Sequence, residues 1–184
     1  LGFPNESPGL LLDPERWSGT SIGSIPIGQG IAVTAMQMLD AYNIVANDGV
    51  HVPPRLVAAT VDADGQRTPV DPGGSRRVIS EQTAAQVREM LTEVVENGTG
   101  KRAQVPGYSV GGKTGTARKP QDTGTYQDES GRYHYVAAFT GMVPAEDPQL
   151  SIIVVIDEPT ATVYGGSAAA PVFADLAKFA LNRF

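Results

Sequence analysis

The sequence predicts a mixed α/β fold, because runs typical of strands and stretches typical of helices share its 184 residues. Apolar runs rich in β-branched and aromatic residues, bounded by turn-forming residues, predict strands at 133–143, at 150–157 and around 113–117. Apolar residues at helical spacing predict helices at 31–47, 80–97 and 169–184.

The first half of the chain carries one predicted helix and one predicted hairpin. The opening thirty residues are rich in Pro, Gly and Ser and predict a loop. The helix at 31–47 should end at Asp48-Gly49, where glycine suits a left-handed cap. Its broad apolar face favours packing against both a sheet and a neighbouring element. Residues 56–61 and the polar stretch after the turn 62–65 predict a hairpin, followed by a loop at 69–77.

The second half carries the other predicted elements. Ser80 is expected to cap the N-terminus of the helix that Gly98 ends. The polar, glycine-bearing stretch 119–131 predicts a mobile loop. Tyr164-Gly165-Gly166 should form the loop before the last helix, which accommodates Pro171 only if this proline lies in the first turn.

Composition excludes several classes of function. With 14 basic and 20 acidic residues, a net charge of −6 and no run of five like charges, the chain is not expected to bind nucleic acid or an anionic membrane. It has no cysteine, and this excludes a disulfide framework and suits an extracytoplasmic protein. No apolar stretch approaches the 18 residues typical of a membrane span.

No metal or cofactor site is predicted. The turn at 62–65 lacks the remaining ligands of a calcium loop. The stretch 98–101 resembles a phosphate-binding loop only weakly, and it ends a helix instead of opening one. His51 and His134 stand alone in the sequence, which favours surface or packing roles.

The most informative stretch is Lys113-Thr114-Gly115-Thr116-Ala117, which we expect at the edge of a sheet. A lysine and two hydroxyls so spaced on a strand can bind a carboxylate. The glycine between the hydroxyls lets a substrate backbone approach closely. The stretch therefore predicts a docking edge for an extended ligand that carries a carboxylate.

Nearly the whole chain resembles the C-terminal part of the transpeptidase domain of a class B penicillin-binding protein, of the septal, division-specific type and most similar to actinobacterial members. The segments that carry the resemblance follow in the family's order: Gly2–Gly9, 17–19, Ile27–Gly30, Ala46–Val50, 53–55, Lys113–Arg118, Phe139–Gly141, Tyr164–Gly166 and Ala169–Phe173. The resemblance implies an antiparallel sheet packed between helices, as in serine β-lactamases, and present here only in part.

The resemblance also implies a chemistry. In that family a serine attacks the bond between the two terminal D-alanines of a peptidoglycan stem peptide, and an amine of a neighbouring stem resolves the acyl-enzyme into a cross-link. Lys113 would supply positive charge beside that serine, and the Thr116 backbone N–H would be one oxyanion donor. The expected substrate-binding residues are Thr114, Gly115, Thr116, Arg118, Gln29, Tyr164 and Gly165. β-Lactams would use the same contacts, and no cofactor is implied.

The family's nucleophile motifs do not occur in these 184 residues: no serine is followed by lysine at the third position or by asparagine at the second. We therefore expect residues 1–184 to be the C-terminal portion of a single transpeptidase domain, catalytically silent without its nucleophile-bearing N-terminal portion. The parent protein is expected at the extracytoplasmic face of the membrane, anchored by an N-terminal helix outside this chain and working with the division machinery.

Two other interpretations stay open. A serine D,D-carboxypeptidase or β-lactamase-like hydrolase shares the Lys-Thr-Gly motif, although it should lack the flanking segments. A non-catalytic module that binds cell-wall peptide or a division partner needs no nucleophile at all. A serine motif in the preceding coding sequence would count against the second interpretation.

Overall fold

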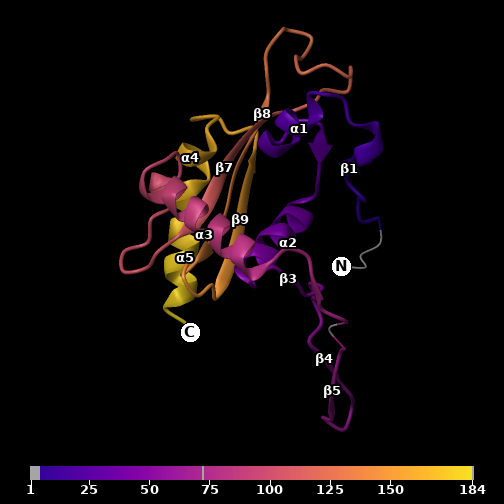
Figure 1. The fold of residues 1–184 in the computed structure, drawn as a ribbon, viewed down its shortest axis with the longest axis vertical. Helices are drawn as coiled ribbons and strands as arrows, with labels where there is room; N and C mark the ends of the chain where they lie inside the picture. Colours follow the sequence, from indigo (N-terminus) through magenta and orange to yellow (C-terminus); the bar gives the residue numbers. More distant parts are fainter. Residues whose placement is uncertain (1–4, 72, 184) are drawn as a thin grey trace.

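The predicted α/β class is confirmed by the computed structural model, which describes residues 5–71 and 73–183. Its centre is a three-stranded antiparallel sheet in the order β7-β8-β9. Helices lie on both sides of this sheet (Figure 1). The strands are Gly111–Arg118 (β7), Tyr135–Val143 (β8) and Leu150–Asp157 (β9), and the longer helices are Ala35–Ala46 (α2), Glu81–Glu96 (α3) and Ala170–Leu181 (α5).

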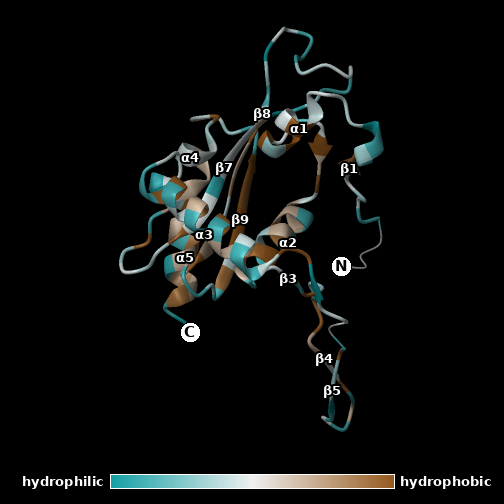
Figure 2. Ribbon diagram, in the orientation of Figure 1, coloured by the Kyte–Doolittle hydropathy of each residue, from teal (hydrophilic) through white to brown (hydrophobic). Residues whose placement is uncertain are grey.

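The two faces of the sheet pack differently. Thr114 of β7, Phe139 of β8 and Val154 of β9 are register partners, so their side chains share a face. Phe139 meets Phe173 of α5 edge to face, with ring centroids 4.9 Å apart, and the main core lies between this face and α5. The opposite face contacts α2. β9 is apolar along most of its length (Figure 2), although Val154 is its one buried residue and Val155 is 47% exposed.

The helix predicted at 31–47 begins later than expected. Ile31–Ala32 (β2) pairs with Leu10–Leu11 (β1) instead of joining the helix. Thr34 then caps α2: its hydroxyl accepts a hydrogen bond from the Gln37 N–H, while the Gln37 side chain accepts one from the Thr34 N–H. This capping box fixes the start of the helix at Ala35. The predicted left-handed glycine after the helix is confirmed, because Gly49 has φ +84°.

The end of the chain corrects a second boundary. Gly165 and Gly166 do not form a loop but begin the short helix Gly165–Ala168 (α4), with Tyr164 as its N-cap. Pro171 lies in the first turn of α5, as predicted. α5 ends at Leu181, earlier than expected, and the predicted end at Phe184 lies outside the described residues. Ser80 caps α3 as predicted, accepting from the Thr83 N–H at 3.0 Å.

The predicted hairpin is confirmed and projects from the body of the molecule (Figure 1). It comprises Ala59–Val61 (β4) and Arg67–Pro69 (β5). The segment at 69–77 is not wholly loop, because Arg76–Arg77 (β6) pairs with Val50–His51 (β3).

The opening segment, predicted as a loop, also contains short regular elements. Besides β1 these are Pro14–Arg16 (η1), Ser21–Ser24 (α1) and Ile25–Ile27 (η2). A further short helix, Lys101–Ala103 (η3), follows α3. Part of the family-like segment 2–9 lies outside the described residues. Among the helices of the described part, none has the length and apolar character needed to cross a membrane.

Candidate active site

The Lys-Thr-Gly stretch lies on β7, at the edge of the central sheet. Among the described residues, β8 is the only strand that pairs with β7. The predicted edge position is therefore confirmed. Thr114 pairs with Phe139 and Thr116 with Ala137, so the motif runs along the middle of the strand.

The backbone N–H and C=O groups of Thr114 and Thr116 point away from β8. The Lys119 N–H donates to the His134 carbonyl at 2.8 Å, one register step beyond the last strand pair. Hydrogen-bonded and non-bonded pairs alternate along an antiparallel ladder, so Gly115 belongs to a bonded pair and Thr114 and Thr116 to non-bonded pairs. The N–H and C=O groups of Thr114 and Thr116 consequently face the open edge, where an extended ligand can pair with them.

The side chains of the motif divide between the two faces of the sheet. Thr114 and Thr116 share the face of α5, where Thr116 Oγ1 accepts a hydrogen bond from the Gly165 N–H at 3.1 Å. The Thr114 hydroxyl lies 2.9 Å from the Thr99 hydroxyl. Lys113 is exposed, and its Nζ donates to the Thr114 carbonyl at 3.0 Å and to the Thr114 hydroxyl at 3.3 Å. A charge and two hydroxyls thus converge on one stretch of strand edge.

Helix α4 packs directly against the strand that carries the motif. A Cβ on Gly165 would collide with the carbonyl oxygens of Gly115 and Ala138, which belong to neighbouring strands. A Cβ on Gly166 would collide with the Thr99 carbonyl oxygen. Both positions therefore require glycine for steric reasons, and the two glycines let α4 approach the site.

A hollow of about 390 Å³ opens between α4, β7 and the segment after α3. The structure brings four predicted site residues together here: Thr114, Thr116, Tyr164 and Gly165. Tyr164 is 67% exposed at the rim. The other lining residues are Thr99, Lys101, Arg102, Gly166 and Ser167.

Sequence reasoning missed the contribution of the segment after α3. Gly98 does end the helix, as predicted, but the next residues also form a wall of the hollow. Arg102 Nη1 donates to the Ser167 carbonyl at 3.0 Å and so joins this wall to α4. The clustered glycines at 98 and 100 were the available signal, because they allow a close approach between backbones.

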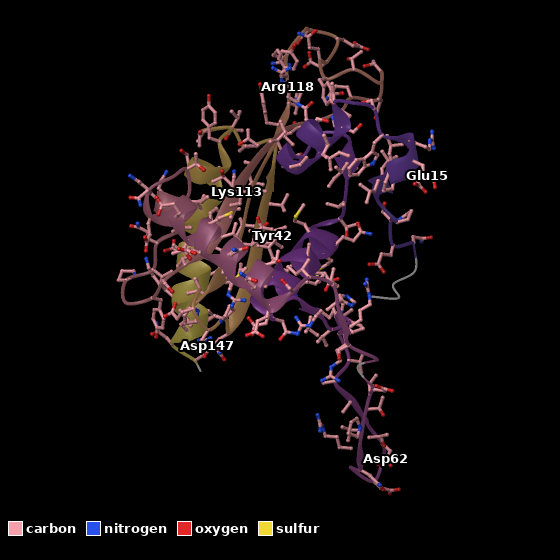
Figure 3. The ribbon with its side chains drawn as sticks, viewed as in Figure 1. Glu15, Tyr42, Asp62, Lys113, Arg118 and Asp147 are labelled. Atoms are coloured by element: carbon pink, nitrogen blue, oxygen red, sulfur yellow. The ribbon has the colours of Figure 1, made fainter. Side chains whose placement is uncertain are left out.

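Four predicted site residues do not line the hollow. Lys113 and Gly115 belong to the motif strand beside it, whereas Arg118 and Gln29 lie further away. The Arg118 guanidinium stacks on Tyr133, 4.2 Å from the ring centroid, at the far end of β7 from Lys113 (Figure 3). Gln29 is exposed in the turn after η2, where its N–H donates to the Ser24 carbonyl at 3.1 Å. A groove role for Arg118 or Gln29 stays a prediction.

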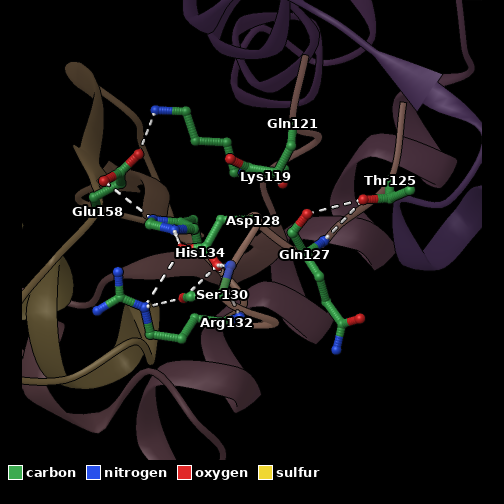
Figure 4. A network of polar contacts seen from close by, with 9 residues as sticks. All are labelled: Lys119, Gln121, Thr125, Gln127, Asp128, Ser130, Arg132, His134 and Glu158. Carbon is green, nitrogen blue, oxygen red and sulfur yellow. Dashed lines mark hydrogen bonds and ion pairs between the residues drawn. The ribbon is translucent and has the colours of Figure 1, made fainter. Parts of the chain in front are cut away.

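A polar network joins the loop 119–134 to the end of β9 (Figure 4). Lys119 Nζ lies 2.7 Å from Asp157 and 2.9 Å from Glu158. His134 lies between two carboxylates, 2.9 Å from Asp128 and 3.2 Å from Glu158. The hydrogen bond with Asp128 raises the pKa of His134, while hydrogen bonds from Ser130 and then His134 hold the pKa of Asp128 well below its usual range.

Both histidines are half-buried and have acidic partners that the sequence did not indicate. His134 is held in the network, and His51 lies 3.0 Å from Asp40. Their partners are distant in sequence or cross a loop, which no local pattern reveals. In the described ranges, no cluster of three or more His, Cys, Asp or Glu side chains could hold a metal ion.

The chain is similar to known proteins over nearly its whole length. The family model described as "Penicillin binding protein transpeptidase domain" matches residues 1–178. Penicillin-binding protein PbpB of Mycolicibacterium smegmatis is 42% identical over 193 residues, covering 100% of this chain and 29% of that protein. The probable peptidoglycan D,D-transpeptidase PbpC of Pseudomonas aeruginosa is 43% identical over 178 residues, covering 96% of this chain and 29% of that protein.

Solved structures agree with these matches. Penicillin-binding protein 3 of Mycobacterium tuberculosis, in crystal structures with aztreonam and with ampicillin, has a TM-score of 0.86 and 40% identity to this chain. The match covers 99% of this chain and 42% of that one. The chain therefore spans less than a third of the length of these two curated relatives and less than half of this solved chain. The resemblance seen in the sequence motifs is confirmed.

Proposed function

Because the chain belongs to the penicillin-binding protein transpeptidase domain family, we propose that residues 1–184 are the C-terminal portion of one such domain and supply its substrate-binding edge. The parent protein is then a peptidoglycan D,D-transpeptidase acting in septal cell-wall synthesis. The observation that carries this proposal is the open edge of β7, where outward backbone groups, Lys113 and the hydroxyls of Thr114 and Thr116 meet beside a hollow.

The geometry suits acyl transfer to a serine supplied by the preceding part of the domain. The serine Oγ bonds to the carbonyl carbon between the two terminal D-alanines, its proton passes to the leaving amine, and D-alanine departs. An amine of a second stem peptide then displaces the serine and closes the cross-link. The outward N–H of Thr116 is placed to donate to the developing oxyanion, and loss of one such donor typically costs roughly 10² to 10³ in rate.

The substrate carboxylate has its own partners on the same edge. Lys113 provides a positive charge that attracts it, and the hydroxyls of Thr114 and Thr116 provide directed donors. A penicillin carries a carboxylate and a reactive carbonyl in similar relation, which fits the ampicillin complex of the mycobacterial relative. Both ligand classes would therefore occupy the edge of β7.

The position of the nucleophile-bearing portion follows from the uncovered part of the sheet. Lys113 and Gly115 lie on the face opposite α5, and Gly115 shares this face with its register partners Ala138 and Val155. At one end of this face Met142 is fully buried, whereas Val155 is 47% exposed. We place the nucleophile-bearing portion over this exposed end, where its serine would stand beside Lys113.

The remaining parts of the proposal concern the parent protein. One relative is named a probable peptidoglycan D,D-transpeptidase. Because peptidoglycan lies outside the cytoplasmic membrane, we place the parent at that face, anchored by a helix upstream of this chain. Its partners would be D-Ala-D-Ala stem peptides, β-lactams, the nucleophile-bearing portion and the division machinery.

A fluorescent penicillin tests the proposal. It would be applied to this chain and to the upstream-extended protein, meaning this chain with the preceding coding sequence through a Ser-x-x-Lys motif. We expect covalent label on the extended protein alone, absent when the motif serine is changed to alanine and blocked by ampicillin. In a second reaction the extended protein would be given stem peptides that end in D-Ala-D-Ala. Cross-linked peptides in mass spectra of the products would indicate a transpeptidase, and peptides shortened by one D-alanine alone would indicate a hydrolase.

The other results would each overturn part of the proposal. An unlabelled extended protein would favour a non-catalytic cell-wall or division-partner module. Label on the 184-residue chain itself would mean that the nucleophile lies within it.

A further inference from the structure

We propose that Thr99 is a positioning residue that directs the hydroxyl proton of Thr114 toward the substrate carboxylate, an inference that rests on the proposed function. Thr99 belongs to the segment after α3 and not to the Lys-Thr-Gly strand. Its Oγ1 nevertheless lies 2.9 Å from Thr114 Oγ1, and both side chains line the same hollow.

The number of donors around Thr114 explains why this contact matters. A threonine hydroxyl has one proton and two lone pairs. Lys113 Nζ, a donor only, already lies 3.3 Å from Thr114 Oγ1 and uses one lone pair. A carboxylate accepts hydrogen bonds and cannot donate them, so Thr114 can bind it only with its own proton.

Thr99 completes this arrangement when it acts as the donor. The 2.9 Å separation allows either hydroxyl to donate to the other. If Thr99 donates, both lone pairs of Thr114 are used and its proton is free for the carboxylate. The chain Thr99 to Thr114 to carboxylate is then cooperative, because each hydrogen bond polarises the next. A ligand carboxylate therefore selects the arrangement in which Thr99 donates.

The surrounding contacts hold Thr99 firmly. The N–H groups of Gly98 and Gly100 donate to the Val94 carbonyl at 3.1 and 2.9 Å, so the segment is folded back onto the end of α3. The Thr99 carbonyl oxygen packs against Gly166, where no side chain would fit. Arg102 reaches the Ser167 carbonyl and fixes the same segment to α4. The Thr99 hydroxyl is consequently presented to Thr114 by rigid backbone.

Replacement by valine and by serine separates this role from a structural one. Thr99→Val keeps the shape of an exposed side chain and removes the hydroxyl, whereas Thr99→Ser keeps the hydroxyl. In the upstream-extended protein we would measure second-order acylation rate constants for benzylpenicillin and for its methyl ester, which lacks the carboxylate charge. Thr68→Val, on the exposed strand of the projecting hairpin, is the matched control.

We expect Thr99→Val to slow acylation by benzylpenicillin about fivefold, as loss of one supporting hydrogen bond implies, and to leave the rate with the ester unchanged. Thr99→Ser and Thr68→Val should stay within about twofold of the unmodified protein. In a Thr114→Val background, Thr99→Val should cause no further loss, because its effect passes through Thr114.

Three results would overturn the inference: unchanged acylation in Thr99→Val, an equal loss with penicillin and ester, or a full additional loss in the Thr114→Val background. Each of these results applies only if penicillin acylates the unmodified extended protein. An extended protein that is not acylated at all would instead refute the proposed function, so the two failures are distinguishable.

Discussion

Gly165 is the residue on which the geometry of the site depends most directly. Its N–H donates to Thr116 Oγ1 at 3.1 Å. A methyl group on its Cα would collide with the carbonyl oxygens of Gly115 and Ala138. Because Thr116 Oγ1 accepts from this N–H, its proton stays available to a ligand. One glycine thus both seats α4 on the sheet and orients a hydroxyl of the site.

We predict that Gly165→Ala destabilises the upstream-extended protein by about 1–3 kcal/mol, the usual cost of overpacking, and slows penicillin acylation. The added methyl group would push α4 away from Gly115 and Ala138 and weaken the hydrogen bond to Thr116. Urea denaturation and acylation rates would measure the two effects. Gly74→Ala is the control, since no atom lies within 4 Å of its added Cβ and it lies outside the opening segment. Equal stability of the two variants would contradict the prediction.

Among the elements, the loop 119–134 is bound to the sheet mainly through charge. Both ring nitrogens of His134 face carboxylates, Asp128 of the loop and Glu158 after β9, which favours the protonated imidazole. Arg132 adds a contact to Asp128 at 3.4 Å, and Lys119 joins Glu158 and Asp157. The loop leaves the motif strand directly at Lys119, so its order bears on access to the site.

We predict that the loop is most ordered in mildly acidic solution and loosens as pH rises. The pKa of His134 is raised by Asp128, so its contribution is complete below the unfolded value of about 6.5 and is lost as pH rises through the folded value. The pKa of Asp128 is lowered, chiefly by Ser130, so its contribution persists until strongly acidic pH. Hydrogen exchange of amides 121–131 at about pH 5 and about pH 8, expressed as protection factors that correct for the intrinsic effect of pH on exchange, would measure the change.

His134→Gln should remove this pH dependence, while His51→Gln, which alters a pair with Asp40 on other elements, should keep it. Protection factors in the loop that do not change with pH in the unmodified protein would refute the prediction that charge holds the loop to the sheet.

The elements also show how far local sequence determines this structure. The motif strand at a sheet edge, the Ser80 cap and the β4–β5 hairpin follow from local patterns, and the structure has them. The pairing of Leu10–Leu11 with Ile31–Ala32 joins strands too short to carry a pattern. Thr99 likewise meets Thr114 only through tertiary packing. Contacts between segments that are distant in the sequence could therefore not be predicted from local sequence patterns.

The molecule as a whole exposes more surface than a compact domain of its mass. Its accessible surface is 12002 Å² for 19.3 kDa. A compact folded monomer of that mass exposes roughly 8,500 Å². Ile22 and Ile27 of the opening segment are 74% and 77% exposed, and the hairpin projects into solvent (Figure 1). This excess is the surface that the proposed nucleophile-bearing portion would bury.

A single polar substitution can test that burial, because it should affect two versions of the protein differently. In the 184-residue chain, Ile27→Ser replaces an exposed side chain and should change the free energy of unfolding by no more than about 0.5 kcal/mol. In the upstream-extended protein the same change should cost about 1.5–3 kcal/mol, the value for a buried isoleucine. Leu176→Ser, at a 46% exposed position on α5, should have the same effect in both. Denaturation midpoints measure each difference, and an Ile27→Ser effect that stays small in the extended protein would mean that the nucleophile-bearing portion packs elsewhere.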